Sequence, residues 1–106
     1  MDAVIPGGAP EVVREFEVLN ENGLHARPAA MLVDTASRYA CEIELENKGH
    51  FASAKSILSV MTIEACSGAI VRVRAKGADA HHAMEALALL FEQKFHEGGE
   101  DGAATD

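Results

Sequence analysis

The chain has 106 residues, 48% of them hydrophobic and 25% charged, which suits one small soluble domain with its own core. The formal net charge of −8 argues against nucleic-acid binding, and no apolar run approaches the ~20 residues that span a bilayer. We therefore expect a cytoplasmic protein without membrane insertion. Its two cysteines, Cys41 and Cys66, are too few for a disulfide framework, so we expect both to be buried, reduced thiols.

The first third of the chain predicts an extension, a strand and a helix. Residues 1–11 contain glycine and proline, show no apolar periodicity and lack the basic start of a signal peptide, which predicts a flexible N-terminal extension. Residues 12–19 alternate imperfectly between apolar and charged side chains, which favours a strand. Residues 20–23 have the composition of a turn. From 26 to 39, apolar residues recur at helical spacing.

The middle of the chain predicts a hairpin followed by a short helix. Residues 41–46 alternate between apolar and glutamate side chains, residues 47–49 give a turn signal, and residues 50–54 return as a short strand. Ser56 is a suitable N-cap residue, because its hydroxyl oxygen can accept from an N–H of the next turn. The helix that follows, 57–64, is mostly apolar.

The last third predicts one more strand and one more helix. Residues 69–75 alternate, with valine and alanine on one face and arginine on the other. Asp79 is expected to cap a helix whose apolar residues follow helical spacing as far as Phe95, and Gly98-Gly99 is expected to end it. Residues 98–106 are small and acidic, which predicts a disordered tail.

The predicted order is strand, helix, strand, strand, helix, strand, helix (βαββαβα). Each predicted strand has one apolar face and one polar face, which is typical of an antiparallel sheet that is covered on one side only. We therefore expect an α+β fold, an open-faced β-sandwich in which three helices cover one face of a four-stranded antiparallel sheet.

A candidate site lies at the start of the first predicted helix. Residues 22–29 read Asn-Gly-Leu-His-Ala-Arg-Pro-Ala and place His25 immediately before the first helical turn. The N–H groups of that turn have no partner inside the helix, and the helix dipole adds partial positive charge. The backbone N–H groups of Ala26 and Arg27, with the Arg27 guanidinium, can therefore bind an anion. We interpret His25 as a residue that is itself phosphorylated.

A lone histidine at a helix start would more often be a surface cap, but two motifs together resemble the histidine-containing phosphocarrier (HPr) family. Residues 23–29, Gly-Leu-His-Ala-Arg-Pro-Ala, resemble that family's active-site motif. Residues 55–61, Lys-Ser-Ile-Leu-Ser-Val-Met, lie at the spacing where the family carries its regulatory serine. The resemblance runs from about Glu15 to Phe95 without an insertion, and it implies an HPr-like phosphocarrier domain over residues 12–97.

The resemblance also implies the strand order first, fourth, second, third. That order suits the charges of this chain, because the outer faces of the first and second strands are rich in glutamate while the fourth carries Arg72 and Arg74. Placing the basic strand between the two acidic ones converts cross-strand repulsion into attraction.

As to function, the resemblance implies a phosphoryl carrier and not an enzyme, with no cofactor and no metal. His25 would accept a phosphoryl group at Nδ1 from phospho-enzyme I and pass it to a histidine of an enzyme IIA component. Arg27 would stabilise the phosphate. In part of the family a serine kinase/phosphorylase acts on the matching serine, so Ser56 is either a regulatory site or simply a helix cap. We expect the carrier to be a monomer.

A carrier that meets unlike partners needs one docking surface, and the resemblance implies the first two helices. Leu58 and Met61 are expected to be exposed, because Val60 and Ile63 already supply an inward-facing pair; for Ile57, exposure and burial are equally expected. The predicted docking residues are Ala30, Met31 and Asp34 on the first helix and Ile57, Leu58 and Met61 on the second.

An alternative is a regulatory phosphocarrier, either of a nitrogen-type branch or of a signalling module that controls enzymes or transcription factors. Ser59 and Glu64 depart from the family pattern, since many members have glycine there, and Glu64 lies close enough to the docking helix to affect partner choice. His81 and His82 are adjacent on a predicted helix and face different directions, so they cannot bind one metal ion together.

Overall fold

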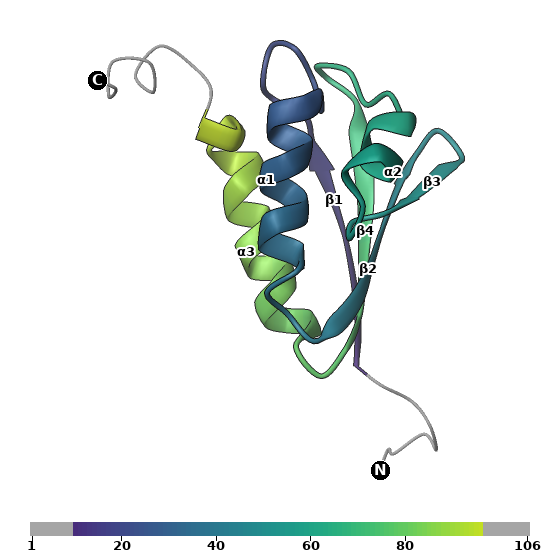
Figure 1. Cartoon of the computed structure of the whole chain (residues 1–106), viewed down its shortest axis with the longest axis vertical. Coiled ribbons are helices and arrows are strands. Elements are labelled where there is room, and N and C mark those ends of the chain that lie inside the picture. Colours follow the sequence, from purple (N-terminus) through teal and green to yellow (C-terminus); the bar gives the residue numbers. More distant parts are fainter. Residues whose placement is uncertain (1–9, 97–106) are drawn as a thin grey trace.

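The structure, a computed structural model, describes residues 10–96 and contains one four-stranded antiparallel sheet with helices on one side. The strand order is β1-β4-β2-β3, and every pair of neighbours is antiparallel. The predicted α+β fold, its element order and its strand order are therefore confirmed. Figure 1 labels the elements β1 (Glu11–Glu17), α1 (Ala26–Ala36), β2 (Cys41–Asn47), β3 (His50–Ser53), α2 (Ile57–Thr62), β4 (Ile70–Gly77) and α3 (Ala80–Glu92); a 3₁₀ turn, η1 (Lys94–His96), follows α3.

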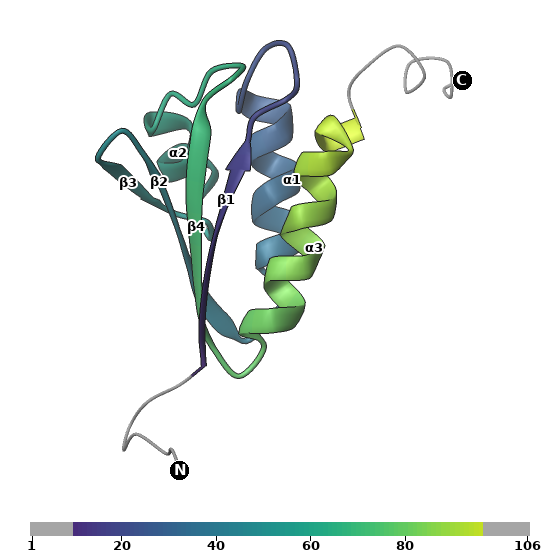
Figure 2. The ribbon, with the colours of Figure 1, turned by 180° about the vertical axis from the view of Figure 1, so that it is seen from behind.

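The two longer helices lie side by side on one face of the sheet, and α2 lies on the same side over the β2–β3 hairpin (Figure 1). Seen from behind, the other face of the sheet carries no helix (Figure 2). Among the described helices, none has the length and apolar character required to cross a membrane. This arrangement leaves α1 and α2 with an outer surface that faces away from the sheet.

The strands form because their side chains alternate between the two faces. In β4, Val71, Val73 and Ala75 are fully buried, whereas the arginines between them are exposed. Arg72 lies between two acidic strands, with its guanidinium 3.7 Å from Glu15 and 3.9 Å from Glu46. The predicted placing of the basic strand between acidic ones is confirmed; exposed pairs of this kind contribute roughly 0.2–1 kcal/mol each, so they favour register more than stability.

The core is closed by three phenylalanine rings between β1 and the C-terminal part of the described chain. Phe16 stacks on Phe91 with ring centroids 4.8 Å apart, and Phe91 meets Phe95 edge-to-face at 5.0 Å. Such ring pairs add about 0.5–1.5 kcal/mol to the stabilisation that area burial provides. They fix α3 against the edge strand β1.

Several predicted helix ends were wrong. The first helix ends at Ala36 and not at residue 39, with Ser37 as its C-cap. The last helix ends at Glu92, and Phe95 is buried from a left-handed turn with φ of 54°, not from a continued helix. The second helix ends at Thr62, because Glu64 has φ of 52°, outside the helical region. The helix end predicted at Gly98-Gly99 and the tail predicted over 98–106 lie outside the described residues.

Three further predictions need correction. Asp79 makes no capping bond to α3; its carboxylate accepts instead from the backbone N–H of Ala40 at 2.9 Å, so it joins two loops. Glu11 belongs to β1, where it pairs with Lys76, and not to the extension predicted over 1–11, of which residues 1–9 lie outside the described part. Of the two cysteines expected to be buried, Cys41 is only half-buried and Cys66 is exposed.

Candidate functional site

His25 is the N-cap residue of α1, with extended backbone angles (φ −81°, ψ −165°), as the motif predicts. Its carbonyl oxygen accepts the first helical hydrogen bond, from the N–H of Ala29 at 2.9 Å. Its imidazole makes no capping bond to the helix. The imidazole therefore lies at the N-terminal end of α1, and it does not cap the helix.

The first turn offers two backbone donors. Ala26 and Arg27 occupy the first two helical positions, and Pro28, at the third, has no N–H. N–H groups at these positions have no acceptor within the helix. The Arg27 side chain is exposed, and among residues 10–96 no carboxylate pairs with it. The two N–H groups, the guanidinium and the helix dipole together can stabilise a doubly negative phosphoryl group on the adjacent imidazole.

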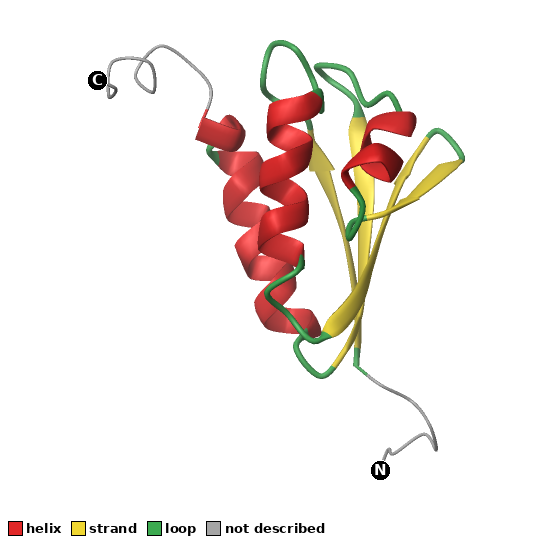
Figure 3. Ribbon diagram, in the orientation of Figure 1, coloured by secondary structure: helices red, strands yellow, loops and turns green. Residues whose placement is uncertain are grey.

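The loop before His25 is held by local and long-range contacts. The N–H of Leu24 donates to the carbonyl oxygen of Ala65 at 2.9 Å, in the loop that follows α2. Gly23 has φ of 71°, and a Cβ there would lie 2.4 Å from the same oxygen, so only glycine fits. Figure 3 shows the two loops meeting at one end of the molecule. The composition predicted a turn at Asn20 to Gly23, but the contact with Ala65 gives no local sequence signal.

Ser56 begins α2 as predicted. Its Oγ accepts from the N–H of Ser59 at 3.2 Å, which is the N-cap bond that a serine can supply. The Oγ of Ser59 in turn accepts from the N–H of Ser53 at 3.0 Å and so ties the helix start to β3. Ser56 remains exposed, so its hydroxyl is sterically accessible while it caps the helix.

The apolar side chains of α2 divide as predicted between core and surface. Val60 and Ile63 are buried, whereas Leu58 is 77% exposed and Met61 38% exposed. Ile57, for which burial was an equal alternative, is 41% exposed. On α1, Ala30 and Met31 are half-buried and Asp34 is exposed; Asp34 accepts a 2.7 Å bond from Arg38 one turn on. Exposed apolar side chains therefore lie on α2, and Figure 1 shows the position of α2 relative to α1.

Lys55, just before α2, links the start of α2 to the C-terminal end of α1. Its Nζ donates to the carbonyl oxygen of Ala36, the last residue of α1, at 2.9 Å and to that of Tyr39, just after the helix, at 3.1 Å. These oxygens carry the partial negative charge of a helix end, which a lysine stabilises. The residue next to Ser56 thus closes the C-terminal end of the helix that begins at His25, a role that the sequence did not indicate.

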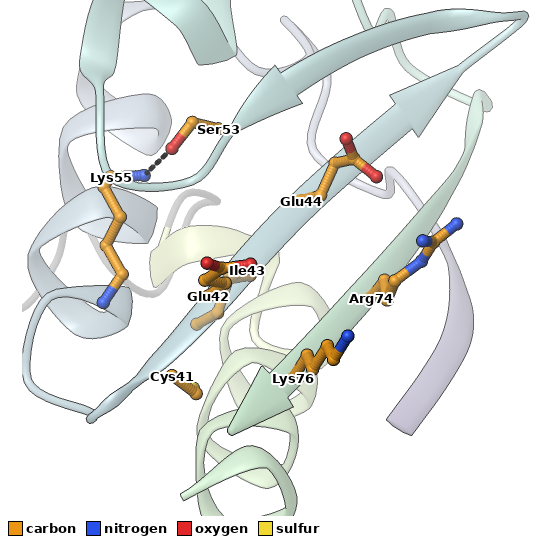
Figure 4. A pocket seen from close by; sticks show the side chains of 8 residues that line it. All are labelled: Cys41, Glu42, Ile43, Glu44, Ser53, Lys55, Arg74 and Lys76. Atoms are coloured by element: carbon orange, nitrogen blue, oxygen red, sulfur yellow. Dashed lines mark hydrogen bonds between the residues drawn. The ribbon is translucent and has the colours of Figure 1, made fainter. Parts of the chain in front are cut away.

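A hollow of about 450 Å³ lies at that end of α1, where β3 stops beside β2 (Figure 4). Burial, with the Asp79 carboxylate, raises the pKa of the half-buried Cys41 thiol, and the Lys55 ammonium opposes the shift. An 11-residue helix, roughly 16 Å long, separates this hollow from His25. In the described part of the chain no cluster of side chains could hold a metal ion. The hollow is lined by Cys41, Glu42, Ile43, Glu44, Ser53, Lys55, Arg74 and Lys76.

Comparison with known proteins identifies the family. The family model described as the PTS HPr component phosphorylation site matches residues 12–93. The phosphocarrier protein HPr of Xylella fastidiosa (strain Temecula1) is 47% identical over 83 residues, which are 78% of this chain and 93% of that protein. The chain therefore belongs to the HPr family, whose members are phosphocarrier proteins of the phosphotransferase system (PTS).

Solved structures agree with this assignment. HPr-C-His from Thermoanaerobacter tengcongensis is similar with a TM-score of 0.76 and 40% identity, over 85% of this chain and 99% of that one. A second structure from this organism, described as an HPr dimer, gives a TM-score of 0.66 and 42% identity, over 76% of this chain and 93% of that one. The open-faced sandwich described above is thus the fold of HPr structures.

Proposed function

We propose that His25 accepts a phosphoryl group from phospho-enzyme I and passes it to a histidine of an enzyme IIA component. The observation that supports this most directly is the position of His25 as N-cap of α1, next to two N–H groups and a guanidinium. We also propose a monomer as the working form. The domain responsible would be the predicted one, residues 12–97.

The transfer requires few chemical groups from the carrier. The neutral Nδ1 of His25 attacks phosphorus as the bond from phosphorus to the donor's histidine nitrogen breaks, and the donor keeps that electron pair. Positioning and electrostatic stabilisation carry most of the catalysis in such reactions. The start of α1 and Arg27 would supply both on the carrier's side. The reverse displacement, on the acceptor's histidine, then discharges the carrier.

Docking would use the exposed apolar side chains of α2 with the adjoining part of α1. Ile57, Leu58 and Met61 lose contact with water on binding, which favours association, and methionine adapts to partners of different shape. Ser56 lies directly beside these residues. A phosphate added to Ser56 by a serine kinase would bring about −2 charge to a surface that must be desolvated. Regulation would then act on docking.

Phosphorylation of His25 can be tested with phosphoenolpyruvate labelled in its phosphate, together with enzyme I of the same organism. Wild-type protein should take up label that is stable to base and labile to acid, and His25→Ala should take up none. His82→Ala is the matched control, because His82 is an exposed histidine in the first turn of α3. Label that persists in His25→Ala, or that is lost in His82→Ala, would contradict the assignment.

The acceptor can be tested with the same labelled carrier. We expect discharge onto an enzyme IIA component of a sugar permease. Discharge only onto a nitrogen-type component would place the protein in the regulatory branch.

A further inference from the structure

We propose that Asn20 is a positioning residue for phosphoryl transfer, because its buried amide closes the loop that holds the backbone of His25 in place. This inference rests on the proposed phosphorylation of His25. Asn20 lies five residues before the histidine and would touch neither the phosphoryl group nor the partner. Its effect would pass through the backbone of the loop.

Two hydrogen bonds close this loop on itself. The Nδ2 of Asn20 donates to the carbonyl oxygen of Gly23 at 2.6 Å, and the N–H of Gly23 donates to the carbonyl oxygen of Asn20 at 3.2 Å. Asn20 is only 2% exposed. A hydrogen bond in such a site is strengthened by the low local dielectric, and water cannot easily replace it. The turn from Asn20 to Gly23 is therefore held as one rigid unit.

The rigid turn continues without a gap into the site. The N–H of Leu24 donates to Ala65, Leu24 is buried, and its neighbour Gly23 has no space for a Cβ. Asn20, Gly23 and Leu24 are thus each held by a buried contact or a hydrogen bond. The two N–H donors belong to α1, whereas the imidazole belongs to the junction between loop and helix. Their relative placement depends on that junction, and a misplacement of about 1 Å can slow a transfer step on the order of 10²-fold.

Asn47 provides a control within the same fold. It is 5% exposed, and its Nδ2 donates to the carbonyl oxygen of Ile63 at 2.9 Å, so it holds the loop after α2 by the same chemistry. Asn47→Ala and Asn20→Ala each remove one buried amide that holds a loop carbonyl. Both should lower the melting temperature, by roughly 5–15 °C for the loss of such a bond. If Asn20 had a purely structural role, Asn20→Ala and Asn47→Ala would also slow phosphoryl transfer equally.

The experiment measures single-turnover phosphorylation by phospho-enzyme I at a temperature where each full-length variant is folded. The maximal rate for Asn20→Ala should fall roughly 10–100-fold, while the enzyme I concentration at half-maximal rate stays within about twofold of wild type. Asn47→Ala should slow transfer far less, because the Ile63 carbonyl that it releases reaches the His25 loop only indirectly, through Ala65 two residues on. The NMR signals of the His25 imidazole should shift further in Asn20→Ala than in Asn47→Ala. Equal rates in the two variants, or a wild-type rate in Asn20→Ala, would overturn the inference.

Asn20→Leu keeps the test valid if Asn20→Ala does not fold, because leucine is close to asparagine in size and fills the buried site without a donor. We expect a maximal rate below that of wild type; a folded Asn20→Leu with the wild-type rate and unchanged imidazole signals would overturn the inference. If wild-type protein itself is not labelled, the proposed function fails instead, so the two failures are distinguishable.

Discussion

At the scale of single residues, Glu64 holds a backbone conformation that glycine adopts more easily. It follows the C-cap Ile63 with φ of 52°, and its N–H donates to the carbonyl oxygen of Met61 at 3.3 Å. Glycine is the usual residue at this position after a helix, since a Cβ in the left-handed region costs roughly 1–2 kcal/mol. Glu64 departs from the family pattern, in which many members have glycine. The left-handed backbone at this position explains why glycine would fit it more easily.

We predict that Glu64→Gly is more stable than Glu64→Ala by about 1 kcal/mol in urea unfolding, because alanine keeps the unfavourable φ and glycine relieves it. At ordinary helical positions the order is the reverse, with alanine more stable than glycine by about 0.5–1 kcal/mol. The alanine variant controls for loss of the carboxylate. An alanine variant as stable as the glycine variant would show that the left-handed conformation is not populated in solution.

At the scale of elements, the turn after α3 is the most strained part of the described chain. Lys94, Phe95 and His96 have φ of 54°, 54° and 60°, so three successive residues with side chains lie in the left-handed region. Each such residue costs roughly 1–2 kcal/mol. The compensating contact is the Phe95 ring, which is buried against Phe91. Packing and backbone strain therefore oppose each other in this turn.

We predict that Phe95→Ala destabilises the protein less than Phe91→Ala. Truncating a buried phenylalanine in a rigid helix costs about 3–5 kcal/mol. At Phe95 the same loss should be roughly 1–3 kcal/mol, because the freed turn can leave its strained conformation. Denaturant unfolding gives both values, and hydrogen exchange should show faster opening after Glu92 in Phe95→Ala. Equal losses would mean that the turn stores no strain.

These elements show why part of the fold could be predicted and part could not. Alternation is a local signal, and it predicted the strand β4. The family resemblance implied the neighbours of β4, and the opposite charges across it agree with that order. Helical spacing correctly predicted that Phe95 is buried. It did not predict the backbone conformation of Phe95, because a left-handed turn after the helix can place a side chain at the same spacing. Asp79 has the sequence signature of a cap, yet its carboxylate binds Ala40, 39 positions away. A contact at that separation depends on the folded chain.

The candidate site divides in the same way. His25, Ala26 and Arg27 are adjacent in the chain, so the start of one helix was sufficient to predict how they lie. The contact between Leu24 and Ala65 joins segments that only the complete sheet brings together, and no local pattern indicates it.

At the scale of the whole molecule, the proposed docking surface includes residues of both α1 and α2, and it can be tested by adding charge near it. Ser56→Asp and Met61→Glu should each weaken enzyme I binding and slow phosphorylation of His25, because both bring charge to an apolar surface that must be desolvated. Neither should lower the melting temperature much, since Met61 is partly exposed and a negative charge suits a helix start.

Ile70→Glu is the control for this prediction, because Ile70 is 52% exposed and alternates with the buried Val71, which places it on the face of β4 that carries no helix. It should leave binding unchanged. Raised salt should restore little activity to Ser56→Asp if the surface itself is altered, whereas a through-space effect on His25 would be screened. Full activity of Ser56→Asp would reduce Ser56 to a helix cap.

The bond from Lys55 to the end of α1 has a consequence for the kinetics of exchange. With the Leu24–Ala65 bond at the opposite end, it joins α1 and α2 at both ends, so the two halves of the proposed docking surface keep one spacing in the free protein. Association then freezes side-chain rotamers but little backbone, and the entropy lost on binding is small. No conformational change has to be reversed before a partner leaves. The residence time on each partner would therefore be set by the contacts of that complex alone, which would let the proposed surface release a donor and meet an acceptor in rapid succession.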